Sequence, residues 1–209
     1  MSLANQFAAY TAWRSRLATY IAELQGWLSN NELSDAQTDL RLTQLLERLR
    51  EDRLNVAFVA EFSRGKSELI NAIFFADYGN RMLPSSAGRT TMCPTELLFD
   101  ASKPPGIELL PIQTRGTNAS VSEYKRFADE WQIVSLDIKS PETMQDALRH
   151  VSETTRVSPD KAAQLGFEVG DSEAELYRVG DDGQVEIPRW RHAVINFPHP
   201  LLKQGLVIL

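Results

Sequence analysis

The chain has 209 residues, of which 43% are hydrophobic and 24% charged, an ordinary composition for a globular protein. Its 28 acidic and 22 basic residues give a formal charge of −6, so we expect no nucleic-acid partner. No stretch approaches the about 20 consecutive apolar residues of a membrane-spanning helix, and the first residues lack a signal peptide's basic and apolar segments. We therefore expect a cytoplasmic protein, and its single cysteine, Cys93, cannot form an internal disulfide.

Residues 1–53 predict an amphipathic helical hairpin. Large apolar residues recur every three or four positions in the first helix, and polar residues fall between them. Ser29, Asn30 and Asn31 interrupt this pattern, and Ser34 with Gln37 has the spacing of a capping box for a second helix that ends near Arg53. The aromatic surface of the first stripe is large enough to require a further partner helix. That stripe is made of Trp13, Leu17, Tyr20, Leu24 and Trp27.

The strongest functional signal follows directly. An apolar run over 54–59 predicts a strand, and the apolar spacing from Lys66 to about residue 76 predicts a helix. Between them the loop ends in Gly65-Lys66-Ser67, with Asn71 four residues further on, the layout of a phosphate-binding P-loop. Ala60 stands where the general motif begins with glycine.

This layout predicts a site for a nucleoside triphosphate. A loop wrapped around a polyphosphate directs backbone N–H groups inward, and the helix N-terminus adds positive potential. Lys66 supplies a mobile cation for the β and γ phosphates, and Ser67 offers its hydroxyl to Mg²⁺. The three histidines are scattered without ligand spacing, so we expect no histidine metal cluster.

The remainder alternates between strand and helix patterns. Residues 82–94 are too polar and too rich in Gly, Pro and Ser for a regular element, so we expect a loop of functional length. Strands are predicted over 95–99, 107–112, 192–197 and 206–209, helices over 122–131 and 141–154, and a hairpin joining 176–179 to 184–187.

Beyond the P-loop, a second set of residues resembles a known family. The pattern Leu83-Pro84, Gly88, Thr91 and Pro94, followed by the strand 96–99, resembles the switch I segment of the dynamin superfamily of large GTPases. The loop 61–67 resembles the E-F-S-x-G-K-[ST] loop of bacterial dynamin-like proteins, and 197–209 is similar to the strand that leads into their Asp-x-x-Gly motif.

The resemblance implies an α/β, three-layer P-loop GTPase domain over 54–209 with an incomplete sheet, preceded by a hairpin (1–53) from a flanking helical bundle. We thus expect an amino-terminal fragment, inactive alone, of an enzyme that binds GTP and GDP with Mg²⁺ and hydrolyses GTP. By resemblance, Ser63 and Thr91 are catalytic, and Ser67 and Thr91 ligate the metal. The expected nucleotide contacts are Glu61, Phe62, Ser63, Arg64, Gly65, Lys66, Ser67 and Glu68.

The expected partners also come from the resemblance. It implies a homo-oligomer and a peripheral membrane contact, with membrane remodelling as the role. Two alternatives stay open from the residues themselves. A P-loop does not distinguish bases, which leaves a P-loop ATPase, and a non-catalytic assembly module could use the same site as a nucleotide-dependent switch.

Overall fold

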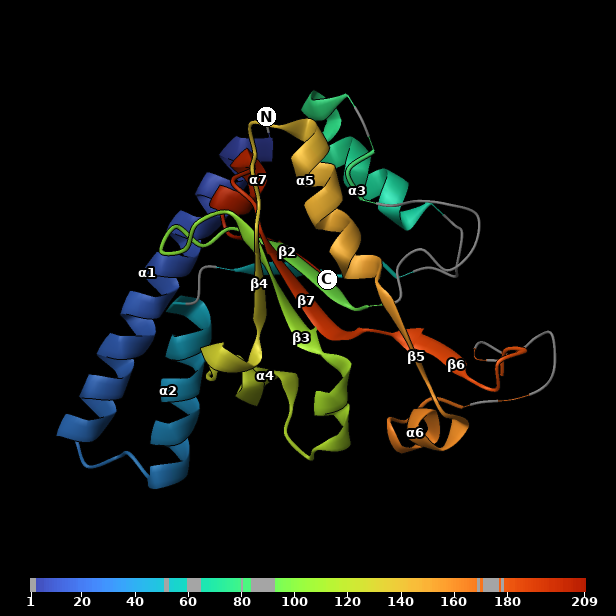
Figure 1. Ribbon diagram of the computed structural model, residues 1–209. Helices are drawn as coiled ribbons and strands as arrows, with labels where there is room; N and C mark the ends of the chain where they lie inside the picture. The colour runs from blue at the N-terminus through green and yellow to red at the C-terminus, as the bar shows by residue number, and fades with distance from the viewer. Residues whose placement is uncertain are drawn as a thin grey trace.

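The computed structural model describes residues 3–50, 53–59, 65–79, 81–83, 93–168, 170, 177 and 179–209. It has an α/β architecture, with a mixed six-stranded sheet in the order β1-β8-β2-β7-β3-β4 and helices packed against it (Figure 1). A separate two-stranded sheet pairs β5 with β6. The predicted α/β class is therefore confirmed.

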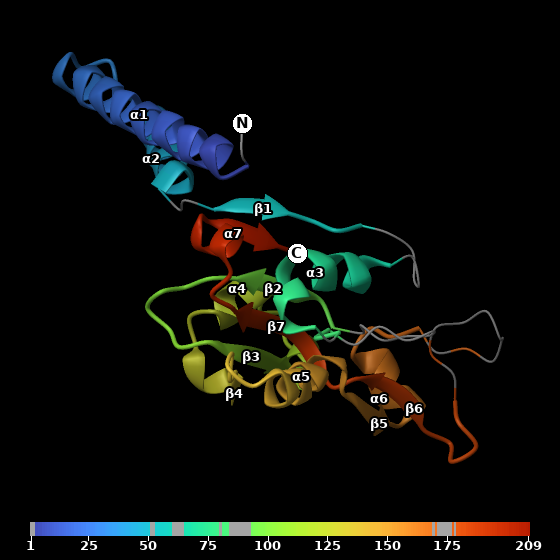
Figure 2. The same cartoon turned by 90° about the horizontal axis from the view of Figure 1, so that it is seen from above.

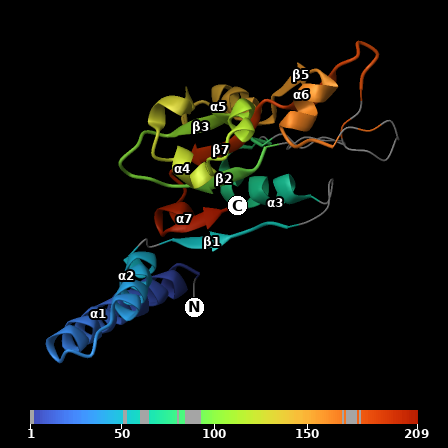
Figure 3. The same ribbon diagram turned by 90° about the horizontal axis from the view of Figure 1, so that it is seen from below.

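The first two helices, α1 (Leu3–Asn30) and α2 (Ala36–Arg50), form the expected hairpin, which extends away from the β1 edge of the sheet (Figures 2 and 3). Gln25 Nε2 on α1 donates to Asp39 Oδ1 and Thr43 Oγ1 on α2 at 2.6 and 3.1 Å. The capping box predicted at Ser34 and Gln37 is wrong. Asp35 is the cap, because its carboxylate accepts from both Thr38 N–H and Thr38 Oγ1, at 2.8 and 2.9 Å.

The large apolar stripe of α1 remains open. Trp13 is 51% and Trp27 56% exposed, and Tyr20 and Leu24 are exposed as well. The more buried positions of α1 lie on a neighbouring face, which includes Arg14, Ile21 and Leu28. The hairpin thus leaves its most apolar face uncovered within one copy of the chain, as the size of that stripe predicts.

Two parallel strands stand at one side of the main sheet, β1 (Leu54–Val56) beside β8 (Leu206–Ile208). β8 is antiparallel to β2 (Thr95–Leu98), which in turn is parallel to β7 (Trp190–Asn196). β3 (Gly106–Pro111) pairs antiparallel with both β7 and the edge strand β4 (Gln132–Ser135). The apolar run at 54–59 is typical of a covered central strand, but β1 lies at an edge with its three residues exposed.

One face of the sheet carries the main core. Side chains from α3 (Lys66–Phe74) and α5 (Pro141–Arg149), including Phe74, Met144 and Leu148, pack on Ile107, Ile195 and other strand residues of this face. α7 (Pro200–Lys203) adds Leu202 to the same core. Single-turn 3₁₀ segments follow α3 and α5, at Ala76–Tyr78 and His150–Ser152. These helices position the candidate site described below.

The opposite face packs on a shorter element. α4 (Val121–Tyr124) is followed by a 3₁₀ turn at Ala128–Glu130, and Trp131 is buried against strand residues such as Leu98 and Val194. The helix predicted over 122–131 is therefore wrong beyond its first turn. A complete capping box at Ser120 and Glu123 begins it, but the chain turns into β4 after Trp131.

A small second unit lies beside the start of β7. It consists of β5 (Thr154–Val157), β6 (Val185–Pro188), α6 (Pro159–Gln164) and the 3₁₀ turn Ile112–Gly116, joined by buried residues such as Ile112 and Leu165. The hairpin turn predicted before β6 is present, since Gly180 N–H donates to Gln184 O at 2.7 Å and Val179 bridges Val185. However, β6 pairs mainly with β5, a strand that the sequence pattern did not predict.

Candidate functional site

The candidate site is built at the start of α3. Gly65 precedes the helix in the left-handed region, with φ 83° and ψ 15°, and its carbonyl oxygen accepts Leu69 N–H at 2.9 Å. Lys66 and Ser67 are the first two helical residues, so the predicted helix start at Lys66 is confirmed. Helix N-termini favour anions, because the peptide dipoles align there. Of the other predicted site residues, Glu68 lies on α3, and Glu61, Phe62, Ser63, Arg64 and Thr91 lie outside the described residues.

The carboxyl ends of β1 and β8 lie at this site. Their parallel pairing continues past the strand bounds, since Leu209 N–H donates to Val56 O at 2.9 Å and Phe58 N–H donates to Leu209 O at 3.0 Å. Phe58 and Leu209 then line a cavity together with Lys66 and Ser67. Ligands of open α/β sheets bind outside the carboxyl ends of the parallel strands, which is where this helix begins.

The cavity has a volume of about 180 Å³ and mostly apolar walls. Leu83 and Cys93 are both on its wall, and both belong to the predicted loop 82–94, whose residues 84–92 lie outside the described residues. The structure therefore brings the two flanks of that segment to the cavity that Lys66 and Ser67 line.

Asn71 anchors one of these flanks to α3. Its side chain is 6% exposed, and its Nδ2 donates to Leu83 O at 2.9 Å while its Oδ1 accepts Leu83 N–H at 2.8 Å. Both polar groups of the Leu83 backbone are thus paired with a single side chain. The sequence motif included Asn71 but gave no indication of this contact.

Two further side chains hold the segment 81–83. Arg81 Nε lies 3.1 Å from Glu68 Oε1 on α3, and Gln145 Nε2 on α5 donates to Arg81 O at 2.7 Å. Glu68, predicted as a nucleotide contact, therefore has its carboxylate paired with a cation. This pairing reduces the repulsion that a carboxylate would exert on a phosphate near the same helix turn.

A wall of the cavity comes from a distant part of the chain. Val151 and Ser152, in the 3₁₀ turn after α5, line the cavity, and Trp190 Nε1 donates to His150 O at 2.6 Å. Glu153 holds the same turn through His150 Nδ1, at 2.5 Å. Sequence reasoning missed this wall, because its position depends on tertiary packing between β7 and the turn and has no local motif.

Cys93 is buried on the cavity wall and donates its thiol to Pro94 O at 3.3 Å. Burial raises the pKa of this thiol to about 12. Cys93 is therefore a neutral thiol at physiological pH, and a buried neutral thiol reacts slowly with electrophiles.

The described donors fit a Mg²⁺ ion in part. Ser67 contributes a hydroxyl oxygen at the cavity, and Mg²⁺ is commonly held by one or two protein oxygens together with phosphate oxygens and waters. In the parts of the chain that the structure describes, no three His, Cys, Asp or Glu side chains group as a metal cluster would require.

The same parts contain no helix with the length and apolar character that a bilayer crossing needs.

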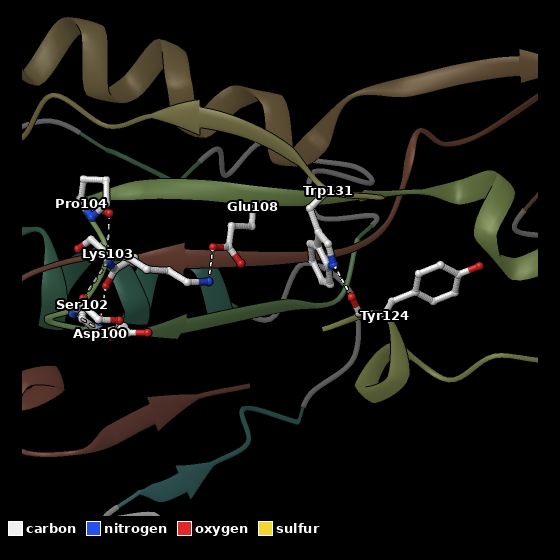
Figure 4. Close-up of polar contacts among 8 residues, drawn as sticks. Asp100, Ser102, Lys103, Pro104, Glu108, Tyr124 and Trp131 are labelled. Carbon is white, nitrogen blue, oxygen red and sulfur yellow. Dashed lines mark hydrogen bonds and ion pairs between the residues drawn. The ribbon is translucent and has the colours of Figure 1, made fainter. Parts of the chain in front are cut away.

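A second cavity, of about 150 Å³ and lined by both charged and apolar side chains, lies on the α4 face of the sheet. Four of its charged lining residues form two ion pairs, with Lys103 Nζ 2.5 Å from Glu108 Oε1 and Lys125 Nζ 2.6 Å from Glu96 Oε1. Figure 4 shows the first of these pairs beside Trp131, whose indole nitrogen donates to Tyr124 O at 2.9 Å. We interpret these contacts as holding the 100–105 turn and α4 in place.

The comparisons with known proteins gave no family. Neither a scan against models of protein families nor a search of curated proteins found a match for this chain.

Proposed function

We propose that this chain binds a Mg²⁺-nucleoside triphosphate through the start of α3. The observation that supports this most strongly is the position of Lys66 and Ser67. They form the first turn of a helix that follows a left-handed glycine, at the carboxyl ends of two parallel strands. A lysine and a hydroxyl at such a helix start suit phosphate and Mg²⁺, respectively.

We further propose that the nucleotide is GTP and that the protein hydrolyses it in the manner of a dynamin-type GTPase. This step rests on the resemblance of the loop 61–67 and of the segment that includes Thr91. In this proposal Ser63 stabilises transition-state charge and Thr91 closes over the γ-phosphate. Self-association and a peripheral membrane contact belong to the same proposal.

The test compares Lys66→Ala with the wild type by calorimetric titration with Mg²⁺-GTP, Mg²⁺-GDP and Mg²⁺-ATP. Loss of the charge-assisted contact should weaken triphosphate binding by about 1.5 to 3 kcal/mol, which is roughly a 10- to 150-fold rise in Kd. Lys161→Ala, at an exposed position of α6, is the matched control. Equal GTP affinity in the wild type and Lys66→Ala would refute the site, and tighter ATP binding would refute the choice of guanine.

A further inference from the structure

Asn71 joins the phosphate-binding end of α3 to the cavity wall. It stands four residues after Ser67, so both side chains leave the helix on the same side, one turn apart. Its amide makes both hydrogen bonds to the Leu83 backbone, and Leu83 lines the same cavity as Lys66 and Ser67. A shift of α3 must therefore move Leu83, unless both hydrogen bonds break.

We propose that Asn71 is a positioning residue of the triphosphate site, which couples occupancy of the first turn of α3 to the position of the cavity wall at Leu83. This inference rests on the proposed nucleotide binding. Because such coupling is reciprocal, a ligand that fixes Lys66 and Ser67 also fixes the wall, and a wall held in place favours the ligand.

The neighbouring contacts allow a matched control. Gln145 also holds this segment through a side-chain amide, by donating to Arg81 O, but it does so from α5. Gln145→Ala loosens the segment without cutting its connection to α3. Asn71→Ala removes both hydrogen bonds between Leu83 and α3 and leaves the Arg81–Glu68 ion pair in place. Asn71→Asp retains an acceptor for Leu83 N–H while losing the amide donor to Leu83 O.

Cys93 provides the readout, because it is the single cysteine of the chain and is buried on the same wall. The experiment measures the rate at which a maleimide labels Cys93, with and without saturating Mg²⁺-GTP, in the wild type and the three variants. Calorimetry with Mg²⁺-GTP and thermal unfolding are measured on the same samples.

In the wild type we expect Mg²⁺-GTP to slow labelling by about tenfold, within the usual range of coupling between sites. Asn71→Ala should label about tenfold faster than the wild type without nucleotide, should bind Mg²⁺-GTP more weakly, and should lose most of the protection that nucleotide gives. Gln145→Ala should keep that protection. If Asn71→Ala does not fold, Asn71→Asp carries the test, with the same direction of change and a smaller size.

Three results would overturn the role of Asn71. The first is unchanged labelling and protection in a folded Asn71 variant. The second is an equal loss of protection in Gln145→Ala. The third is an Asn71 variant that labels faster but whose labelling rate depends on denaturant as global unfolding does, with its Mg²⁺-GTP affinity unchanged. That result would show that Asn71 only stabilises the fold. Absence of Mg²⁺-GTP binding to the wild type would instead refute the proposed function, and this inference with it.

Discussion

His192 Nε2 lies 3.0 Å from Glu96 Oε1, across the adjacent strands β7 and β2, and both side chains are mostly buried. Lys125 Nζ approaches the same carboxylate at 2.6 and 2.9 Å. The hydrogen bond with His192, with the contribution of Lys125, lowers the pKa of Glu96 from 4.5 to about 2. This cluster ties α4 to the centre of the sheet.

The depressed pKa predicts a pH dependence of stability. A carboxylate with a lower pKa in the folded state stabilises the fold above its unfolded pKa, and this contribution is lost as the pH falls from about 4.5 to about 2. Glu96→Gln should reduce the free energy of unfolding near neutral pH, by at most about 3 kcal/mol, and flatten its decline in that acidic range. Urea titrations at several pH values test this, with the exposed Glu47→Gln as control. The prediction is wrong if the free energy of unfolding of Glu96→Gln falls with decreasing pH as steeply as that of the wild type.

Ser67→Ala addresses the metal. If Ser67 gives its hydroxyl to Mg²⁺, the variant should bind GTP with less dependence on Mg²⁺ concentration, and the affinity in the presence of a chelator should stay near that of the wild type. Titrations of GTP across a series of Mg²⁺ concentrations measure this. An unchanged Mg²⁺ dependence would exclude Ser67 as a ligand.

The same substitution should have opposite effects at two glycines. A Cβ added at Gly65 or at Gly26 would meet no atom within 4 Å, so neither alanine should clash with its surroundings. The two substitutions should therefore differ because of the backbone conformation alone. Gly65 has φ 83°, so Gly65→Ala should destabilise the fold by about 1–2 kcal/mol. Gly26 lies inside α1, where Gly26→Ala should stabilise by roughly 0.5–1 kcal/mol. Chemical denaturation followed by circular dichroism compares them, and equal signs would contradict the left-handed turn before α3.

Two buried indoles offer another matched pair. Trp190→Phe removes the donor to His150 O, and Trp131→Phe removes the donor to Tyr124 O. Each should cost about 0.5–1.5 kcal/mol of stability, because one hydrogen bond is lost while each carbonyl keeps a backbone donor, Glu153 N–H at 3.2 Å for His150 O and Phe127 N–H at 3.0 Å for Tyr124 O. Only Trp190→Phe should also weaken Mg²⁺-GTP binding, since His150 precedes the cavity residues Val151 and Ser152. If the two variants bind Mg²⁺-GTP equally well, the turn at His150 does not contribute to nucleotide binding.

The exposed stripe of α1 should drive self-association. Replacing Trp13 and Trp27 with glutamine should lower the sedimentation coefficient at high protein concentration, because the largest apolar side chains of that face are removed. Stability should change by no more than about 0.5 kcal/mol per exposed position. Glu23→Gln on the same helix is the control. If it lowers the sedimentation coefficient as much as the tryptophan replacements do, the stripe is not the surface through which copies of the chain associate.

Local patterns were sufficient to predict the elements with strong periodicity or distinct boundaries. The hairpin helices, the start of α3 at Lys66, and strands β2, β3, β7 and β8 all agree with the sequence. The two strands that the sequence did not predict were missed for the same reason. β4 and β5 are short segments whose strand character depends on a neighbour, since β4 pairs with β3 and β5 with β6. Propensity alone does not specify such partners.

In the candidate site, too, some residues could be predicted from the sequence and others could not. Gly65, Lys66 and Ser67 are recognisable because backbone geometry and phosphate chemistry require those residue types in that order. The anchor at Leu83 and the wall at Val151 involve backbone groups and ordinary apolar side chains. Any residue supplies a backbone amide, so the sequence carries no signature of the first, and only the tertiary contact between Trp190 and His150 reveals the second.

The four tryptophans divide evenly between the hairpin and the main sheet, and this gives the molecule two optical reporters. Trp13 and Trp27 are open to water on α1, whereas Trp131 and Trp190 are buried on opposite faces of the sheet. Iodide should quench the red-shifted emission of the first pair and leave the blue-shifted emission of the second nearly intact. Fluorescence from one unlabelled sample can therefore follow the melting of the hairpin separately from that of the sheet.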